Sequence, residues 1–213
     1  MFPVKIGILG SGLVGQALAK GLADLGHDVV VGSRGGDKLR DFRAGTNIGE
    51  GTFEHAARHG EVVVLALKGE VAEAVVEQLA EALTGKVILD TTNPIAGAVE
   101  GGVVPYFTLP GESLLQRLQQ RAPQGRFVKC FNSVAAHLMV KPDFGGRIPA
   151  MFICGDDQEA KALASGFVEA LGWATEDVGT SAAGHAVEAL CQLWCAPGFL
   201  REDWHHAFAV LRN

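Results

Sequence analysis

The sequence predicts an α/β fold of the Rossmann type, in which a doubly wound, mostly parallel sheet is followed by a short C-terminal helical appendage. A short apolar run ends in Gly10-Ser11-Gly12-Leu13-Val14-Gly15, and apolar residues at helical spacing follow directly. Apolar runs and helical patterns then alternate along most of the 213 residues, which is typical of a parallel sheet with right-handed crossovers. The run at 62–67 is continuously apolar, as in a strand covered on both faces.

The stretch from Ile6 to Arg34 predicts a strand, a tight turn, a helix and a second strand. In its G-x-G-x-x-G motif, Gly10 permits a sharp turn, Gly12 allows the backbone to approach a pyrophosphate, and Gly15 allows the helix to pack against the strand. Unpaired N–H groups at the helix N-terminus would face the anion. Because the motif lies between the strand and the helix that it requires, we interpret it as a dinucleotide-binding site rather than as a purely structural turn.

The residues after the second strand indicate which dinucleotide is bound. A unit that binds NAD usually carries Asp or Glu here to hold the ribose 2′-hydroxyl, whereas this chain has Gly32-Ser33-Arg34 and no acid until Asp37. Ser33 can donate a hydrogen bond to a 2′-phosphate, and Arg34 can form a charge-assisted pair with it. Lys38 adds positive charge nearby, although it fits the solvated face of a surface helix equally well. The pattern therefore predicts NADP(H).

Composition and charge exclude several other classes of protein. A net charge of −6, with no basic run that includes aromatic residues, argues against a nucleic-acid-binding surface. The longest apolar run, Val62 to Leu67, is too short to cross a bilayer, and no signal-peptide pattern precedes the first strand. We therefore expect a soluble cytoplasmic protein that binds neither nucleic acid nor membrane. The four Cys residues lack C-x-x-C spacing and are expected to be reduced and mostly buried.

Two loops are expected to meet beside the cofactor. The stretch 93–112 contains three Pro and four Gly and leaves the C-terminal end of a strand predicted at 86–89. The stretch 132–137 leaves the end of the next strand, predicted at 127–131. Doubly wound sheets bind ligands at this edge, so we place the substrate between these loops.

Polar residues mark the starts of three further helices. Thr52, Ser113 and one residue of the Asp156-Asp157 pair are placed to cap their first turns. The last of these helices lies between two further predicted strands, at 150–154 and 173–178.

The C-terminal part of the chain is expected to be helical. We divide the chain into an NADP-binding Rossmann domain, 1–179, and C-terminal helices, 180–213. Pro197-Gly198 is expected to end the first helix, and a second would cover 199–211. Their aromatic residues would form an exposed apolar patch, which predicts a homodimer in which these helices contribute to the interface and to the acceptor site. These residues are Trp194, Phe199, Trp204 and Phe208.

Several segments resemble one known family. They are GILGSGLVGQALAKGLADLGHDVVVGSR, LDTTNPI, VKCFNSVAAHLM, ICGDDQEAKALASGFVEALG and the ending DVGTSAAGHAVEAL. Together they resemble the NADPH-dependent reductases of the deazaflavin coenzyme F-420 (F420), and they are similar to the cytosolic domain of metalloreductases. The resemblance runs from Ile6 to about Trp194 and implies direct hydride transfer between NADP(H) and a small-molecule acceptor with a flavin-like ring, either F420 or FMN or FAD.

The resemblance also implies which residues bind each part of NADP(H). The chain departs from the archaeal members at Asn132-Ser133, where they carry His-Thr, and at Ala135, where they carry Pro. Those positions face the acceptor, so its identity stays open. The implied contacts are Ser11, Gly12, Leu13 and Val14 for the pyrophosphate, Ser33, Arg34 and Lys38 for the 2′-phosphate, Ala66, Leu67 and Lys68 for the adenosine and pyrophosphate side, and Asn93, Pro94, Ile95, Ala135 and Ala136 for the nicotinamide.

The expected chemistry requires neither a side-chain acid nor a metal. Hydride transfer to a ring that delocalises its own charge needs mainly proximity and orientation, so we assign no catalytic residue. His137 is more typical of a helix surface or a satisfied core position. His185, Glu188 and Cys191 lie at i, i+3 and i+6, which turns Cys191 away from a shared ion, so no metal site is predicted.

Other functions were weighed against this one. An NADPH-dependent ferric or flavin reductase and a non-catalytic NADP(H)-binding redox sensor remain alternatives. A hydroxyacid dehydrogenase or imine reductase is disfavoured, because such enzymes usually build the substrate site with a large helical domain and the stretch after Gly179 is short. If the acceptor is F420, Lys129, Lys141 and Arg147 are candidates to receive its negatively charged tail.

Overall fold

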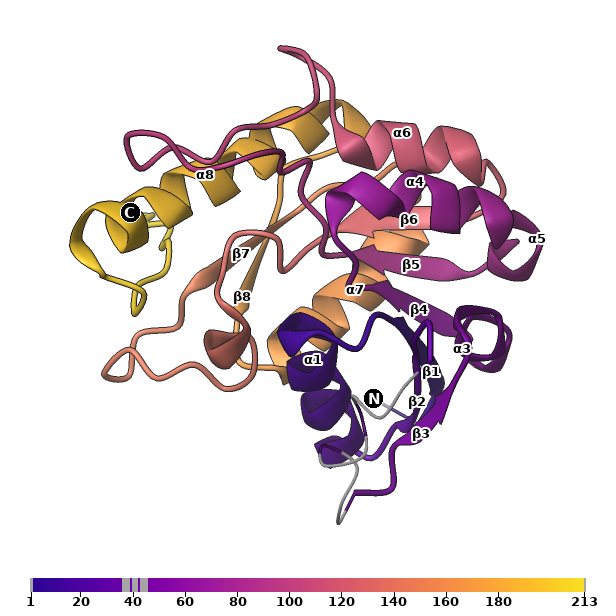
Figure 1. Cartoon of the computed structure of the whole chain (residues 1–213). Helices are drawn as coiled ribbons and strands as arrows, with labels where there is room; N and C mark the ends of the chain where they lie inside the picture. The colour runs from indigo at the N-terminus through magenta and orange to yellow at the C-terminus, as the bar shows by residue number, and fades with distance from the viewer. Residues whose placement is uncertain (1, 36–38, 40–41, 43–45, 213) are drawn as a thin grey trace.

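Six parallel strands form the central sheet in the order β3-β2-β1-β4-β5-β6 (Figure 1). The computed structural model describes residues 2–35, 39, 42 and 46–212. The strand order reverses between β1 and β4, and this switch point opens the crevice in which doubly wound sheets bind ligands. The predicted fold class is therefore confirmed. The strands are β1 (Lys5–Leu9), β2 (Asp28–Gly32), β3 (Gly49–Gly51), β4 (Val62–Leu65), β5 (Val87–Asp90) and β6 (Arg126–Lys129).

The helices cover both faces of this sheet. α1 and α7 pack on one face and α3, α4, α5 and α6 on the other, with α8 crossing one end of the molecule (Figure 1). Alternate residues of one strand enter the two cores: Val62 and Val64 join the first, whereas Val63 and Leu65 join the second. The bounds are α1 (Leu13–Asp24), α3 (Phe53–His59), α4 (Gly69–Gln78), α5 (Ala80–Leu83), α6 (Leu114–Arg121), α7 (Gln158–Ala170) and α8 (Gly184–Arg201), with short 3₁₀ helices η2 (Ala136–Leu138) and η3 (Ser181–Ala183).

The three predicted capping residues all cap their helices. The side chain of Thr52 accepts a hydrogen bond from His55 N at the start of α3. Ser113 accepts one from Gln116 N at the start of α6. Of the Asp156-Asp157 pair, Asp157 is the cap of α7. These hydrogen bonds satisfy amide donors that have no partner inside the helix.

The predicted strand–helix–strand unit near the C-terminus forms a small sheet of its own. β7 (Ala150–Ile153) and β8 (Ala174–Asp177) pair in parallel on either side of α7 in the sequence. An antiparallel bridge between Lys129 and Cys154 joins this sheet to the end of β6.

The prediction of two C-terminal helices was wrong. α8 continues through Pro197 to Arg201, and the described residues after it form no further helix. A Cβ at Gly198 would lie 2.3 Å from the Trp204 ring, so the returning chain packs directly on the last turn of α8. This tertiary contact offsets the cost of a proline inside the helix.

The C-terminal aromatic residues are largely covered by their own chain. Trp194 is 4% exposed, and its indole lies 5.7 Å from that of Trp204. Phe208 packs edge-on against Phe152. Of the four aromatic residues expected to form an open patch, Phe199 is the most exposed, at 49%. The reason given for a homodimer therefore does not hold for this cluster.

None of the described helices combines the length and the apolar character that a membrane span requires. All four Cys are free, and Cys130, Cys154 and Cys191 are buried as expected.

Candidate functional site

The turn between β1 and α1 has the geometry that its glycines predict. Gly10 has a φ of 134°, and a Cβ there would lie 2.1 Å from the carbonyl oxygen of Ala66. A Cβ at Gly15 would lie 1.9 Å from the carbonyl oxygen of Gly10. A Cβ at Gly12 would have no atom within 4 Å. Packing therefore requires two of the glycines, whereas Gly12 faces open space that a ligand can enter.

The N-terminus of α1 is suited to an anion. Gly12 is its N-cap and offers no side-chain cap, and no acidic residue lies in the first turn. The first amides of the helix therefore keep their hydrogen-bonding capacity, and the helix dipole adds partial positive charge. Gln16 Nε2 donates to the Ser11 carbonyl oxygen at 2.9 Å and thereby holds the turn against the helix.

A cavity of about 600 Å³, here called the turn cavity, joins this turn to the ends of β2 and β4. Ser33 and Arg34 enter it from β2, and Ala66, Leu67 and Lys68 enter it after β4. Gly10, Ser11 and Gly12 line it from the turn. The structure thus brings Ser11 and Gly12, predicted for the pyrophosphate, together with Ser33 and Arg34, predicted for the 2′-phosphate, whereas Leu13 and Val14 line other cavities. Lys38, also predicted for the 2′-phosphate, lies outside the described residues.

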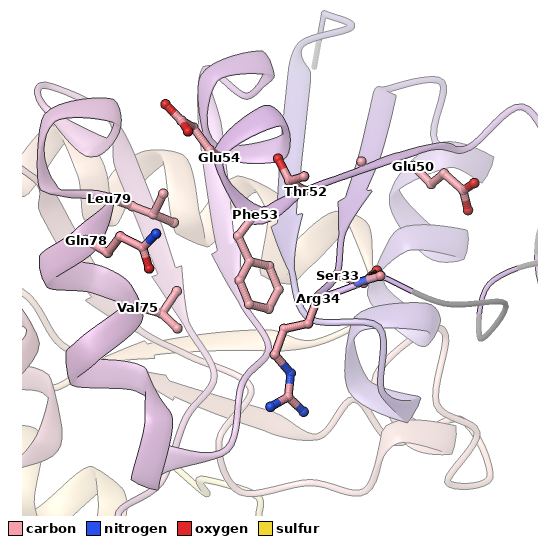
Figure 2. Close-up of a pocket in the computed structure, with 11 residues that line it drawn as sticks. Ser33, Arg34, Glu50, Thr52, Phe53, Glu54, Val75, Gln78 and Leu79 are labelled. Carbon is pink, nitrogen blue, oxygen red and sulfur yellow. Dashed lines mark hydrogen bonds between the residues drawn. The ribbon is translucent and has the colours of Figure 1, made fainter.

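Arg34 is available for a ligand. The residue is exposed, and the ion pairs among the described residues do not include it. Figure 2 shows its guanidinium extending from the end of β2 into open space next to the Phe53 ring. Ser33 Oγ accepts a hydrogen bond from Gly35 N, so its hydroxyl hydrogen remains able to bond an anion. Two donors of suitable chemistry therefore stand side by side at the end of β2.

A second cavity, about 780 Å³ and here called the β2 cavity, continues from Ser33 and Arg34. Phe53, Val75 and Leu79 supply apolar surface, while Thr52 and Gln78 supply polar groups (Figure 2). An aromatic face beside polar rim groups is suited to a heteroaromatic base. Their place at this cavity was not predicted from the sequence, because they come from two separate helices and the ends of these helices, α3 with its cap Thr52 and α4 with its cap Leu79.

A third cavity, about 390 Å³ and here called the β5 cavity, continues in the other direction. It shares Ala66, Leu67 and Lys68 with the turn cavity and ends at Asn93 and Ile95. Val14, Thr91 and Thr92 also line it. The three cavities therefore adjoin along the C-terminal edge of the sheet, from the end of β2 to the end of β5, as an extended dinucleotide requires.

The loops after β5 and β6 converge as predicted. Asn93 Nδ2 donates to the Asn132 carbonyl oxygen at 2.7 Å, and Asn132 Nδ2 donates to Asn93 Oδ1 at 3.1 Å. Asn132 Nδ2 also donates to the Val187 carbonyl oxygen of α8 at 2.9 Å. Asn132 Oδ1 is buried and has no hydrogen-bond partner among the described residues. The paired asparagines tie both loops to α8.

The other residues predicted for the nicotinamide lie in different surroundings. Pro94 is buried, and its carbonyl oxygen accepts a hydrogen bond from Phe107 N. Ala135 and Ala136 line a separate, mostly apolar cavity of about 540 Å³ between α1 and η2. Leu13 lines that cavity whereas Val14 lines the β5 cavity, so the first turn of α1 separates the two.

The histidine and thiol groups form no evident catalytic centre. His137 is exposed, and its ring lies 6.4 Å from that of His205. Cys191 and Cys195 face each other with their Sγ atoms 3.9 Å apart, and their contact lowers the pKa of Cys195. Among the described residues, no three His, Cys, Asp or Glu side chains are grouped to hold a metal ion.

Lys129 was expected to receive a charged acceptor tail, and this expectation was wrong. Its side chain is fully buried, with Nζ lying 2.6 Å from Asp90 Oδ2 and 2.9 Å from Glu188 Oε1. Nζ also donates to the Thr92 carbonyl oxygen at 2.8 Å. Burial alone would lower the pKa of Lys129, but the two carboxylates outweigh it and raise the pKa, so the group stays charged. Lys141 and Arg147 are exposed.

Comparison with known proteins identifies relatives of this chain. Residues 5–94 match the family model described as NADP oxidoreductase coenzyme F420-dependent. The F420-dependent NADP reductase of Methanothermobacter marburgensis is 30% identical over 179 residues, which cover 78% of this chain and 79% of that protein. Metalloreductase STEAP3 of Rattus norvegicus is 34% identical over 188 residues, 87% of this chain, but the chain spans only 36% of that protein.

A solved structure agrees with these relatives. The crystal structure of a candidate F420-dependent NADP reductase from Arthrobacter sp. FB24 superposes with a TM-score of 0.91 at 27% identity. The match covers 98% of this chain and 100% of that one.

The turn geometry predicts opposite effects of two alanine substitutions. Gly10→Ala introduces a backbone clash at a positive φ and is expected to destabilise the fold by more than about 3 kcal/mol. Gly12→Ala has a permitted backbone and free space, with φ −78° and ψ −177°, and should cost about 1 kcal/mol or less. Urea denaturation of both variants measures the difference. Equal losses would mean that Gly12 is also required by packing.

Proposed function

The chain belongs to the coenzyme F420-dependent NADP oxidoreductase family, and from this premise we propose that it transfers a hydride between NADP(H) and a flavin-like acceptor. One observation carries the cofactor assignment. Ser33 and Arg34 share the turn cavity with Gly10, Ser11 and Gly12 of the glycine turn, and no acidic residue stands at the end of β2. The site therefore offers donors for a 2′-phosphate where an NAD-binding unit offers a carboxylate.

We assign the parts of NADP(H) to the three cavities in order. The adenine occupies the β2 cavity beside Phe53, and the 2′-phosphate contacts Ser33 and Arg34. The pyrophosphate lies at the amides of 11–14, and Ala66, Leu67 and Lys68 line its other side. The nicotinamide reaches the β5 cavity at Asn93 and Ile95. Four further predicted contacts stay predictions: Lys38 for the 2′-phosphate, and Pro94, Ala135 and Ala136 for the nicotinamide.

The residues bind and orient the reactants rather than exchange protons with them. NADP(H) supplies the hydride when bound, and a flavin-like ring delocalises the charge that it gains. The paired Asn93 and Asn132 hold both loops at the nicotinamide end, which limits the geometries that the reactants can adopt. We therefore propose no catalytic acid.

The acceptor is F420, FMN or FAD, with an NADPH-dependent ferric or flavin reductase as the second candidate. The burial of Lys129 supports this second candidate. A buried Lys129 cannot bind the anionic tail of F420, so only two of the three cations considered for that tail remain. Similarity to a metalloreductase points the same way. Lys141 and Arg147 remain as exposed cations for a charged tail.

We also propose a homodimer, with residues 1–179 binding NADP(H) and 180–213 supplying the interface. The support comes from the exposed face of α8. Leu193 and Leu200 are each 61% exposed, and the exposed Ala186 and Ala189 lie on the same side of the helix. A helix that is apolar on both faces is normally covered on both.

Arg34 should decide between NADPH and NADH. A charge-assisted hydrogen bond contributes roughly 1.5 to 3 kcal/mol, so Arg34→Ala should weaken NADPH binding roughly ten- to a hundredfold. NADH lacks the phosphate and should bind almost unchanged. Calorimetric dissociation constants for both cofactors test this, with Arg201→Ala at the exposed end of α8 as the matched control. Parallel losses for NADH and NADPH would remove the main support for the cofactor assignment.

NADPH oxidation should require a flavin-like acceptor. The loss of NADPH absorbance is measured with F420, FMN, FAD and chelated ferric iron as alternative acceptors. We expect turnover with F420 or a flavin, and turnover should fall in Arg34→Ala at limiting NADPH. Turnover with ferric iron alone would select the second candidate. If NADPH binds but no acceptor is reduced, the protein would instead be a redox sensor.

A charge on the exposed face of α8 should separate the proposed dimer. Leu193→Glu is expected to give a monomer, because an unpaired carboxylate would be desolvated in the interface. Ile148→Glu is the control, since Ile148 is similarly exposed, at 68%, but lies outside α8. Size-exclusion chromatography with light scattering measures both. A wild-type protein that elutes as a monomer at micromolar concentration contradicts the proposal.

A further inference from the structure

A buried ionic cluster lies directly behind the paired asparagines. It consists of Lys129, Asp90 and Glu188, whose side chains are 0%, 0% and 2% exposed. Lys129 Nζ forms ion pairs with Asp90 Oδ2 and Glu188 Oε1 and donates a hydrogen bond to the Thr92 carbonyl oxygen. None of these three residues lines the β2, turn or β5 cavity, so the cluster has no place in the binding contacts described above.

One arm of the cluster determines the backbone in front of Asn93. Asp90 Oδ1 accepts hydrogen bonds from Thr92 N at 2.9 Å and from Thr92 Oγ1 at 2.6 Å. Lys129 binds the Thr92 carbonyl oxygen, which belongs to the peptide group that leads into Asn93. Both the amide and the carbonyl of Thr92 are therefore held, which restricts the backbone that leads into Asn93.

The other arm determines the position of Asn132. Glu188 Oε2 and Oε1 accept hydrogen bonds from Leu114 N and Leu115 N, each at 3.0 Å, at the start of α6. This anchors α8 at Glu188. The carbonyl oxygen of the preceding residue, Val187, accepts from Asn132 Nδ2. Asn93 is thus adjacent in the chain to Thr92, which the cluster holds, and Asn132 is hydrogen-bonded to Val187, which is adjacent in the chain to Glu188.

The energetics favour a role in orientation. Replacing a buried ion pair by apolar side chains of similar volume is often neutral or stabilising, so stability alone does not account for this cluster. Buried charges that are held by ion pairs and hydrogen bonds from three directions do restrict the arrangement of the groups around them. A site that binds a reacting ring requires the polar groups of its loops to be held in one orientation.

We infer that Lys129, with Asp90 and Glu188, is a positioning residue that holds the Asn93–Asn132 pair in the orientation that receives the nicotinamide end of NADP(H). This inference rests on the proposed function and extends it to residues that do not touch the cofactor. It divides the cofactor into two independently held parts. The adenosine part depends on Arg34, and the nicotinamide part depends on the buried cluster.

Two ligands separate these parts. NADP+ carries both ends, whereas adenosine 2′,5′-bisphosphate keeps the 2′-phosphate end and lacks the nicotinamide. Lys129→Met should weaken NADP+ about three- to tenfold, the effect of about one lost hydrogen bond, and leave the bisphosphate within about twofold of wild type. Calorimetry with the 213-residue chain gives both constants.

Two further variants keep the test decisive. Glu188→Gln replaces the second carboxylate of the cluster by an amide of similar size, and Glu188 lines none of the cavities described above. It should act in the same direction even if Lys129→Met does not fold. Lys161→Met is the matched control. Lys161 is also buried, its Nζ lies 2.9 Å from Asp177 Oδ2, and it donates to the Gly179 carbonyl oxygen rather than to a cofactor loop. It should lower stability without changing the ratio.

The outcomes distinguish the inference from its premise. If wild type binds both ligands and both Lys129→Met and Glu188→Gln keep the wild-type ratio, the positioning role is wrong while the cofactor assignment stands. An altered ratio in Lys161→Met would also overturn the inference, since any buried ion pair would then suffice. If wild type binds neither ligand, the proposed function fails and the inference fails with it.

Discussion

The burial of Lys129 is the constraint on which the reacting edge of the sheet depends. A buried ammonium group without partners is strongly unfavourable, so the fold must deliver acceptors to it. They come from the end of β5, from the Thr92 carbonyl and from α8. These elements are distant in sequence, and Figure 1 shows α8 crossing the end of the molecule beside the loop that follows β5. The ionic cluster around Lys129 thus connects the sheet, the loop after β5 and the C-terminal helix.

The two ends of the candidate site are held in different ways. Arg34 is exposed, and only the end of β2 determines where its backbone lies. Its side chain can therefore adjust to a phosphate. Asn93 and Asn132 are held by hydrogen bonds to each other and to α8. Between them, Gly12 leaves free space in front of a helix N-terminus. An adaptable end suits a flexible charged group, and a rigid end suits a ring that must meet an acceptor in one geometry.

Features that depend on neighbouring residues were predictable from the sequence, and those that depend on distant contacts were not. The glycine turn and the caps at Thr52, Ser113 and Asp157 are local hydrogen-bonding and steric patterns, and all were predicted. β3 was not predicted, because it is a three-residue edge strand with two glycines. In the sequence, Lys129 is typical of a cation that binds an anion at a strand end. Its burial depends on Glu188, which is distant in the sequence and pairs with it only in the folded chain. In the sequence, Pro197 indicates the end of a helix. In the structure α8 continues through it, and the contact of Trp204 with Gly198 that accompanies this could not be predicted from neighbouring residues.

The second face of α8 links assembly to the site. Its buried face carries Glu188 and Val187, which hold the two loops, and its exposed face carries Leu193 and Leu200. A helix transmits displacement along its length because its backbone hydrogen bonds resist deformation locally. A second subunit that covers the exposed face in the proposed dimer would therefore restrain the same rigid element that orients Asn132. In that arrangement, association would stabilise the geometry of the nicotinamide end without contributing a residue to it.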